Sequence, residues 1–155
     1  MSVAARLAEL GLTLPEVVPP VAAYVPAVRQ GDLVYTAGQL PMVNGELPAT
    51  GKVGTGAGLV DPEQAQALAR QAALNGLAAA ASLLGDVDKI TRVVKVVGFV
   101  ASDVSFTGQP QVINGASQVL QEILGDAGVH ARSAVGVAVL PMDAPVEVEL
   151  ILEVA

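Results

Sequence analysis

The sequence predicts an α+β protein in which two long helices pack on one face of a mixed β-sheet. Two helical patterns, each with start and stop signals, separate valine-rich stretches that are typical of strands. The chain has 155 residues and is 52% hydrophobic, which suits one domain with a substantial core. The expected order is strand, helix, strand, helix, strand, strand, and this order favours a sheet covered by helices.

The first twenty residues are expected to form a separate N-terminal extension. Residues 3–11 predict a short amphipathic helix, and "TLPEVVPP" (13–20) ends it with three prolines. One apolar face of this helix is made of Val3, Leu7 and Leu10. We therefore expect residues 1–20 to be an extension and residues 21–155 to be a single domain.

The first strand and a long loop follow this extension. "DLVYTAGQLP" (32–41) predicts a strand that ends at Gly38, and residues 43–58 are rich in loop-forming residues. Asn44-Gly45 is a typical tight-turn dipeptide. "GTGAG" (54–58) is similar to a phosphate-binding loop, but it lacks the following Lys-Ser/Thr, so a flexible loop is the better interpretation.

Two helices and a strand occupy the middle of the chain. Asp61 can cap a helix that begins at Pro62 and stops at Gly85. Residues 88–101 predict a valine-rich strand, and a second helix is expected from about Pro110 to Leu124.

Two strands, roughly 133–140 and 146–154, complete the predicted sheet. If they form a hairpin, Glu147 pairs near Val139, and Arg132 lies about 23 Å away at about 3.3 Å per residue. The two residues could then share a ligand only across a subunit interface. Helices on one face leave the other face of the sheet bare, and the core must be built from small side chains because only 3% of residues are aromatic. Both features favour an oligomer.

Composition excludes several classes of function. The net charge is −7 and the eight cations are scattered singly, so we expect neither nucleic-acid nor membrane partners. The absence of cysteine excludes disulfides and thiolate catalysis, and a single histidine argues against a zinc site, so we expect no metal. No signal peptide or membrane span is evident, and a cytoplasmic location is expected.

Arg132 is the last cation of the chain and precedes an apolar run. In a strand from residue 132, it shares a face with three small residues, Ala134, Gly136 and Ala138. Its planar guanidinium can hold a carboxylate with two hydrogen bonds. A structural ion pair with Glu147, Glu149 or Asp126 explains the residue equally well, and the sequence pattern leaves both readings open.

The other candidate side chains have plain structural explanations. Glu147 and Glu149 lie on one strand face, either as a solvated surface or as carboxylates that position water. His130 is interpreted as a loop residue before a strand rather than a general base, because no nucleophile with a third partner is evident. Ser133 is interpreted as a strand residue.

The combined pattern resembles the RidA family, also called YjgF/YER057c/UK114. The C-terminal signature is "Ala131-Arg132-Ser133…Leu140-Pro141…Val146-Glu147-Val148-Glu149", and "AAYVPAV" (22–28) and "LVYTAGQLP" (33–41) match further upstream. The resemblance spans roughly residues 20–154. It implies a chorismate-mutase-like α+β subunit that forms homotrimers with clefts between subunits.

The resemblance also implies an activity. Better-known members hydrolyse 2-imino and 2-enamino acids to 2-oxo acids and ammonia without metal or cofactor. By the match, Arg132 clamps the substrate carboxylate and Glu147 orients the attacking water. The remaining residues expected to bind substrate are Tyr24, Ala37, Gly38 and Asn114.

Three departures distinguish this chain and leave other functions open. Ala37 replaces a serine, His130 replaces a proline, and Ala134 replaces a cysteine found in some members. These changes indicate a divergent, longer subfamily. The alternative function is a trimer that binds small carboxylates or 2-oxo acids without turnover. The name ribonuclease, attached to parts of the family, is disfavoured by the acidic charge.

Overall fold

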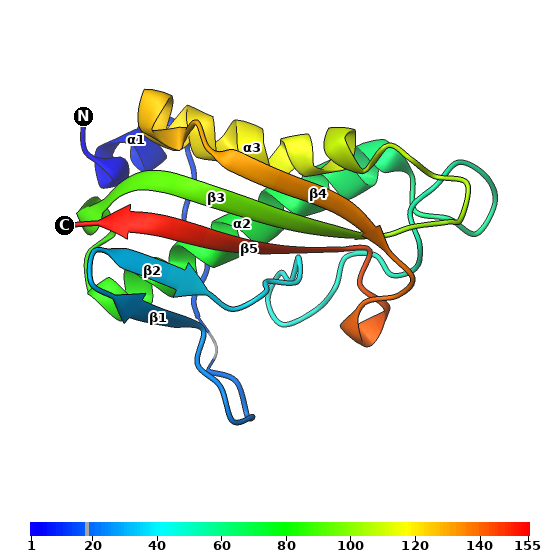
Figure 1. The fold of residues 1–155 in the computed structure, drawn as a ribbon, viewed down its shortest axis with the longest axis horizontal. Coiled ribbons are helices and arrows are strands. Elements are labelled where there is room, and N and C mark those ends of the chain that lie inside the picture. The colour runs from blue at the N-terminus through cyan, green and yellow to red at the C-terminus, as the bar shows by residue number, and fades with distance from the viewer. Residues whose placement is uncertain (18) are drawn as a thin grey trace.

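A computed structural model describes residues 1–17 and 19–155 and contains a five-stranded sheet with two long helices behind it (Figure 1). Val18, which falls inside the predicted break at 13–20, lies outside the described residues. The helices are α1 (Val3–Glu9), α2 (Pro62–Leu84) and α3 (Gln109–Leu124), with short 3-10 turns η1 (Val87–Lys89), η2 (Gly125–Gly128) and η3 (Pro141–Asp143). The strands are β1 (Ala27–Gln30), β2 (Leu33–Thr36), β3 (Ile90–Ala101), β4 (Ala131–Val137) and β5 (Val146–Val154).

The sheet is mixed, and its order is β1-β2-β5-β3-β4. Only β3 and β4 pair in parallel, and every other neighbouring pair is antiparallel. Both long helices cover the same face, which confirms the predicted α+β arrangement (Figure 1). Helix α1 lies against α3 and contributes Val3 and Leu7 to the common core.

The predicted hairpin between the last two strands is wrong. Strand β3 lies between β4 and β5 and pairs with both, so Glu147 is opposite Phe99 and not near Val139. The connection from β4 to β5 contains Met142 and Asp143 in left-handed backbone conformations and crosses over the end of β3. Two strands joined by a short connection usually pair with each other, but here a third strand, distant in sequence, lies between them.

Strand β1 was absent from the prediction. Its four residues have only one buried side chain, Ala27, so no apolar alternation marks them as a strand. The strand exists because Gly31, with φ of 61°, allows a tight return into β2. Strand β2 itself is shorter than predicted, because Gly38 comes after the regular pairing ends at Thr36.

The signals for local structure in α2 and in the loop were confirmed. The Asp61 carboxylate accepts a hydrogen bond from the Glu63 N–H at 2.8 Å, and Gly85 ends the helix with φ of 73°. Asn44 and Gly45 have φ of 51° and 81°, as a tight hairpin turn requires.

Small residues let the helices approach the sheet and each other. An ideal Cβ at Gly115 on α3 would overlap the Gln66 carbonyl of α2, and one at Gly98 would meet Ile113 within 2.5 Å. Seven alanines of α2 are buried: Ala65, Ala69, Ala72, Ala73, Ala78, Ala79 and Ala80. The core is therefore closely packed from alanine and valine, as composition predicted.

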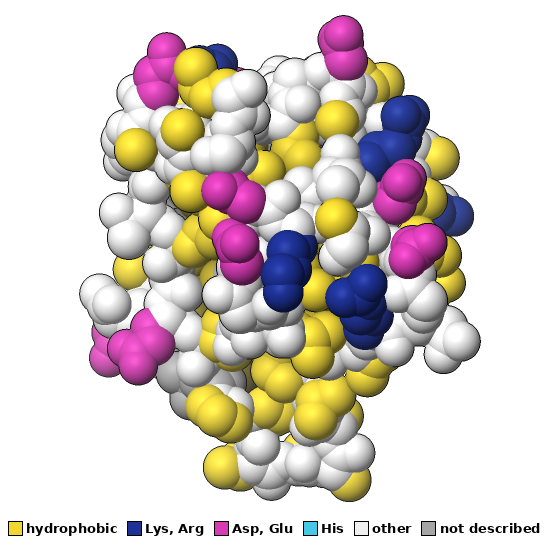
Figure 2. All heavy atoms as spheres, turned by 90° about the vertical axis from the view of Figure 1, so that its left-hand side faces the viewer, with side chains coloured by type: hydrophobic (Ala, Val, Ile, Leu, Met, Phe, Trp, Pro, Cys, Tyr) yellow, Lys and Arg dark blue, Asp and Glu magenta, His cyan; other side chains and the backbone are white. Residues whose placement is uncertain are grey.

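The side of the molecule that bears the N-terminus and C-terminus has mixed charge. Figure 2 shows Lys and Arg side chains next to Asp and Glu, with apolar atoms exposed between them and on the protrusion at the bottom. No helix within residues 1–17 and 19–155 is long and apolar enough to cross a membrane.

Candidate functional site

Arg132 lies at the edge of the sheet and points toward the helices. Strand β4 is an edge strand, and Arg132 is opposite Val96, which is buried on the helix face. Neighbours across a sheet project from the same face. The guanidinium is therefore partly buried between β4 and α3.

Helix α3 holds one end of this guanidinium. Its Nη1 donates to Asn114 Oδ1 at 2.7 Å and to Ser117 Oγ at 3.3 Å. An arginine has five N–H groups, so the Nε–H and both Nη2–H groups remain. Within the described residues these groups have no hydrogen-bond acceptor, and no carboxylate lies within ion-pair distance of Arg132. The ion pairs with Glu147, Glu149 or Asp126, which the sequence left open as an alternative, are therefore not formed within the subunit.

His130 and Ser117 extend this cluster, and the sequence analysis missed their role. His130 Nε2 is 2.9 Å from Ser117 Oγ, and its Nδ1 is 2.6 Å from the Gly128 carbonyl oxygen. Ser117 is only 8% exposed. Two spacings could have revealed the cluster. Asn114 and Ser117 are three residues apart on a helix, and His130, directly before β4, is two residues from Arg132.

Glu147 lies on the opposite, open face of the sheet. It alternates along β5 with the buried Val146 and Val148 and packs against Gly38, where an ideal Cβ would overlap its carboxylate. Partial burial raises the pKa of the Glu147 carboxyl, and the nearby charge of Glu149 raises it further. No cation of the described chain pairs with it. Glu147 is thus a carboxyl that holds its proton more strongly than usual.

The segment after β2 brings further predicted residues to Glu147. The Ala37 N–H donates to the Pro26 carbonyl at 2.7 Å, and the Gln39 N–H donates to the Val148 carbonyl at 2.8 Å. Between them, the Gly38 N–H has no protein acceptor among the described residues. Tyr24 precedes the edge strand β1 and is 59% exposed.

The predicted site residues therefore form two separate groups in one subunit. The arginine group contains Asn114, Ser117, His130 and Arg132, and the glutamate group contains Ala37, Gly38 and Glu147. Tyr24 precedes β1, at the edge of the sheet opposite β4. Glu147 aligns with Val135 across β3, so Arg132 is three residues and two strands away, about 14 Å at the usual spacings. The two side chains also point to opposite faces, and one subunit cannot bring them together.

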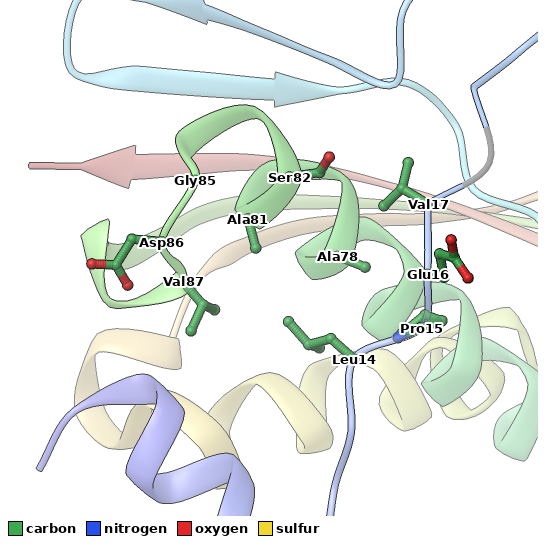
Figure 3. A pocket seen from close by; sticks show the side chains of 10 residues that line it. All are labelled: Leu14, Pro15, Glu16, Val17, Ala78, Ala81, Ser82, Gly85, Asp86 and Val87. Carbon is green, nitrogen blue, oxygen red and sulfur yellow. The ribbon is translucent and has the colours of Figure 1, made fainter.

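The hollow in Figure 3 is elsewhere on the molecule. It has a volume of about 400 Å³ and lies between the N-terminal segment, including Leu14 and Val17, and the C-terminal end of α2, including Ala78 and Ser82. It contains none of the predicted site residues. No group of His, Asp and Glu side chains suited to a metal ion occurs within the described ranges.

Comparison with known proteins identifies the family. Residues 4–154 match the model described as "YjgF/chorismate mutase-like, putative endoribonuclease". Protein TCP17 of Trypanosoma cruzi is 41% identical over 152 residues, which cover 97% of this chain and 93% of that protein. The crystal structure of Atu1372 from Agrobacterium tumefaciens is 46% identical, covers 99% of this chain and 92% of its own, and has a TM-score of 0.88. E. coli TdcF with bound serine is 27% identical, with 88% and 92% of the two chains covered and a TM-score of 0.64. The chain belongs to the YjgF/RidA family.

Proposed function

We propose that this protein hydrolyses 2-imino and 2-enamino acids to 2-oxo acids and ammonia, at sites shared between the subunits of a homotrimer. One observation carries the proposal. Arg132 is a partly buried guanidinium whose Nε and Nη2 donors have no acceptor within the described chain. Burying a charge is costly unless a partner compensates it, and a small carboxylate is the partner that fits two parallel donors.

When Arg132 binds the substrate carboxylate, the adjacent C=N carbon is the atom that water attacks. Water adds to the C=N carbon, the nitrogen gains a proton, and the resulting carbinolamine releases ammonia as the carbon becomes a 2-oxo group. This reaction requires proton transfers but no oxidant, reductant or metal. Holding the substrate in a fixed position and placing one water beside it supply much of the rate.

Glu147 is suited to the proton transfers. Burial, together with the nearby charge of Glu149, raises the pKa of Glu147 from its usual acidic value toward neutrality. A carboxyl whose pKa is raised in this direction can accept a proton from the attacking water and return one to the leaving nitrogen. The Gly38 N–H beside it, which has no acceptor in the described part of the chain, can donate to a substrate or water oxygen.

The separation of the two groups supports a site at a subunit boundary. Arg132 is at the β4 edge, whereas Tyr24 precedes the opposite edge and Glu147 faces the open side of the sheet. That open side carries partly buried or exposed apolar residues such as Tyr35, Phe99 and Val135, which a neighbouring subunit would cover. One subunit's arginine group would then face its neighbour's glutamate group.

The first experiment measures imine hydrolysis. An amino-acid oxidase generates 2-imino acids from aliphatic, acidic and aromatic amino acids, and semicarbazide traps the imine that survives. The wild type should reduce trapping, and Arg132→Ala should lose the effect. Arg70→Ala is the matched control, because Arg70 pairs with Glu122 on the helix surface. Equal trapping with and without the wild type, for every imine, would refute the deaminase.

A second experiment tests whether the site is shared. Trimers made only of Arg132→Ala subunits, or only of Glu147→Ala subunits, are each expected to lose most of their activity. Mixed trimers, made by co-expression, contain some boundaries with both intact residues, so part of the activity should return. Mixed trimers that remain inactive, although both variants fold and assemble by light scattering, would place the two residues in separate functions.

A non-catalytic carboxylate binder is the second candidate. The same Arg132 donors support it, and E. coli TdcF has been crystallised with bound serine, a small carboxylate. Titration with a 2-oxo acid, followed by NMR, distinguishes the two. Binding that depends on Arg132 without any acceleration of imine hydrolysis would establish the binder. Salt-dependent RNA binding would instead favour the ribonuclease described for the family model.

A further inference from the structure

We propose that Ser117 and His130 are positioning residues that fix the Arg132 guanidinium through a one-way chain of hydrogen bonds, so that its Nε/Nη2 edge faces the substrate. The proposal rests on the carboxylate-binding role of Arg132 proposed above. It adds two residues and the orientation in which the ligand is held.

The first link of the chain sets the tautomer of His130. Nδ1 lies 2.6 Å from the Gly128 carbonyl oxygen, and a carbonyl can only accept a hydrogen bond. Nδ1 must therefore carry the proton. In the neutral ring Nε2 is then an acceptor, and its neighbour at 2.9 Å is the Ser117 hydroxyl. Ser117 must donate to His130.

The second link connects Ser117 to Arg132. Because the hydroxyl proton of Ser117 is committed to His130, its oxygen is available to accept from Arg132 Nη1 at 3.3 Å. The other Nη1 proton goes to Asn114 Oδ1 at 2.7 Å. Both Nη1 protons are thus used by helix α3, and the guanidinium cannot present its Nη1/Nη2 end to a ligand. The edge formed by Nε and Nη2 is the only bidentate edge that remains.

Each link has one donor and one acceptor, so the direction of the chain is determined by the Gly128 carbonyl. A charged His130 would donate from both nitrogens and would displace the Ser117 proton from its acceptor. It would also add a second cation next to the guanidinium. Of the two neutral tautomers, the one with the proton on Nδ1 therefore fits both contacts of His130.

Ser117 is only 8% exposed, which favours a positioning role for its hydroxyl over a role as the nucleophile. A nucleophile must reach the substrate, whereas a nearly buried hydroxyl between an imidazole and a guanidinium can only orient its neighbours. Position 117 therefore acts through Arg132. Polar groups joined in such a chain also polarise one another, which strengthens the bonds at its end.

The tautomer is tested directly, without any ligand. His130 is the only histidine, so a long-range ¹H–¹⁵N spectrum of uniformly labelled wild-type protein at neutral to basic pH contains a single imidazole pattern. We expect the Nδ1–H tautomer, with a changed Nε2 signal in Ser117→Ala. An Nε2–H tautomer would overturn the proposal whether or not the protein is a deaminase.

The effect on the ligand is tested with 2-oxobutyrate and with imine hydrolysis. Ser117→Ala and His130→Ala should each weaken 2-oxobutyrate binding and raise KM about tenfold, as expected for a hydrogen bond that holds a charged group, with kcat nearly unchanged. His130→Gln, whose amide oxygen can accept from Ser117, should recover part of the affinity. Ser82→Ala on α2 is the matched control. Unchanged affinity in Ser117→Ala, with wild-type binding intact, would refute the positioning role, whereas loss of binding in the wild type itself would refute the proposed function.

Discussion

Substitution of Gly38 by alanine should damage the proposed reaction while leaving the fold intact. An ideal Cβ at position 38 would overlap the Glu147 carboxylate oxygen and would lie 2.8 Å from Glu147 Cδ and 3.2 Å from Cγ. Ordinary contact begins at 3.4 Å, so Cδ must move by at least 0.6 Å and the oxygen by more. A displacement of about 1 Å in a group that places a reacting water costs on the order of 100-fold in rate.

The stability of Gly38→Ala should change little. The atoms in the way belong to the end of a flexible side chain on the open face, and the backbone of Gly38 is not in a left-handed conformation. We expect the free energy of unfolding, measured by urea denaturation, to change by less than about 1 kcal/mol. The rate of imine hydrolysis, measured by semicarbazide trapping, should fall about 100-fold.

A double-mutant cycle decides whether Gly38 acts through Glu147. In a Glu147→Ala background the carboxylate that would be displaced is absent, so Gly38→Ala should have almost no further effect on the residual rate. Equal losses from Gly38→Ala in both backgrounds would contradict the reasoning, because the glycine would then serve some other contact. Binding of 2-oxobutyrate is measured alongside, since the arginine group should be unaffected in the same variant.

Three further predictions concern packing, titration and capping. Gly115→Ala should destabilise the fold by about 1–3 kcal/mol in urea denaturation. The added Cβ would overlap the Gln66 backbone, which cannot rotate away as a side chain would. Unchanged stability would show that α2 and α3 can move apart at little cost. Glu147→Gln should be more stable than the wild type at neutral pH and equally stable in acid. The pKa of Glu147 is higher in the folded protein than in the unfolded chain, so wild-type stability falls as the pH rises from the unfolded-state pKa through the folded-state pKa. A difference in the free energy of unfolding that is constant at all pH values would exclude titration of Glu147 as the cause. Asp61→Ala should lower the free energy of unfolding by about 1 kcal/mol through loss of the cap, with Asp61→Asn close to wild type in the same thermal or urea scan.

Local signals explain which parts of the fold were predictable. The caps of α2, the Asn44-Gly45 turn and the alternation of β5 depend on residues close in sequence, so the chain itself specifies them. Strand β1 has no such signal, because it depends on pairing with β2. The order of the last strands was equally hidden: the insertion of β3 between β4 and β5 satisfies backbone hydrogen bonds that no short pattern reports.

The candidate site divides in the same way. The resemblance to the RidA family was sufficient to name Arg132 and Glu147, because both positions lie within the C-terminal signature, and it also named Asn114. The contact between Asn114 and Arg132, and the addition of Ser117 and His130, required the packing of α3 against β4. Residues from distant motifs meet only through tertiary structure.

The sequence by itself determined the α+β class, the helix ends, the small-residue core and the family, since composition, periodicity and motif spacing are properties of the chain. The tertiary structure decided that Arg132 and Glu147 point to opposite faces of one sheet, because the side-chain direction in a strand depends on register, and register is set by the partner strands. It also decided that, among the described residues, the Nε and Nη2 donors of the guanidinium have no acceptor, because α3 binds only its Nη1 end.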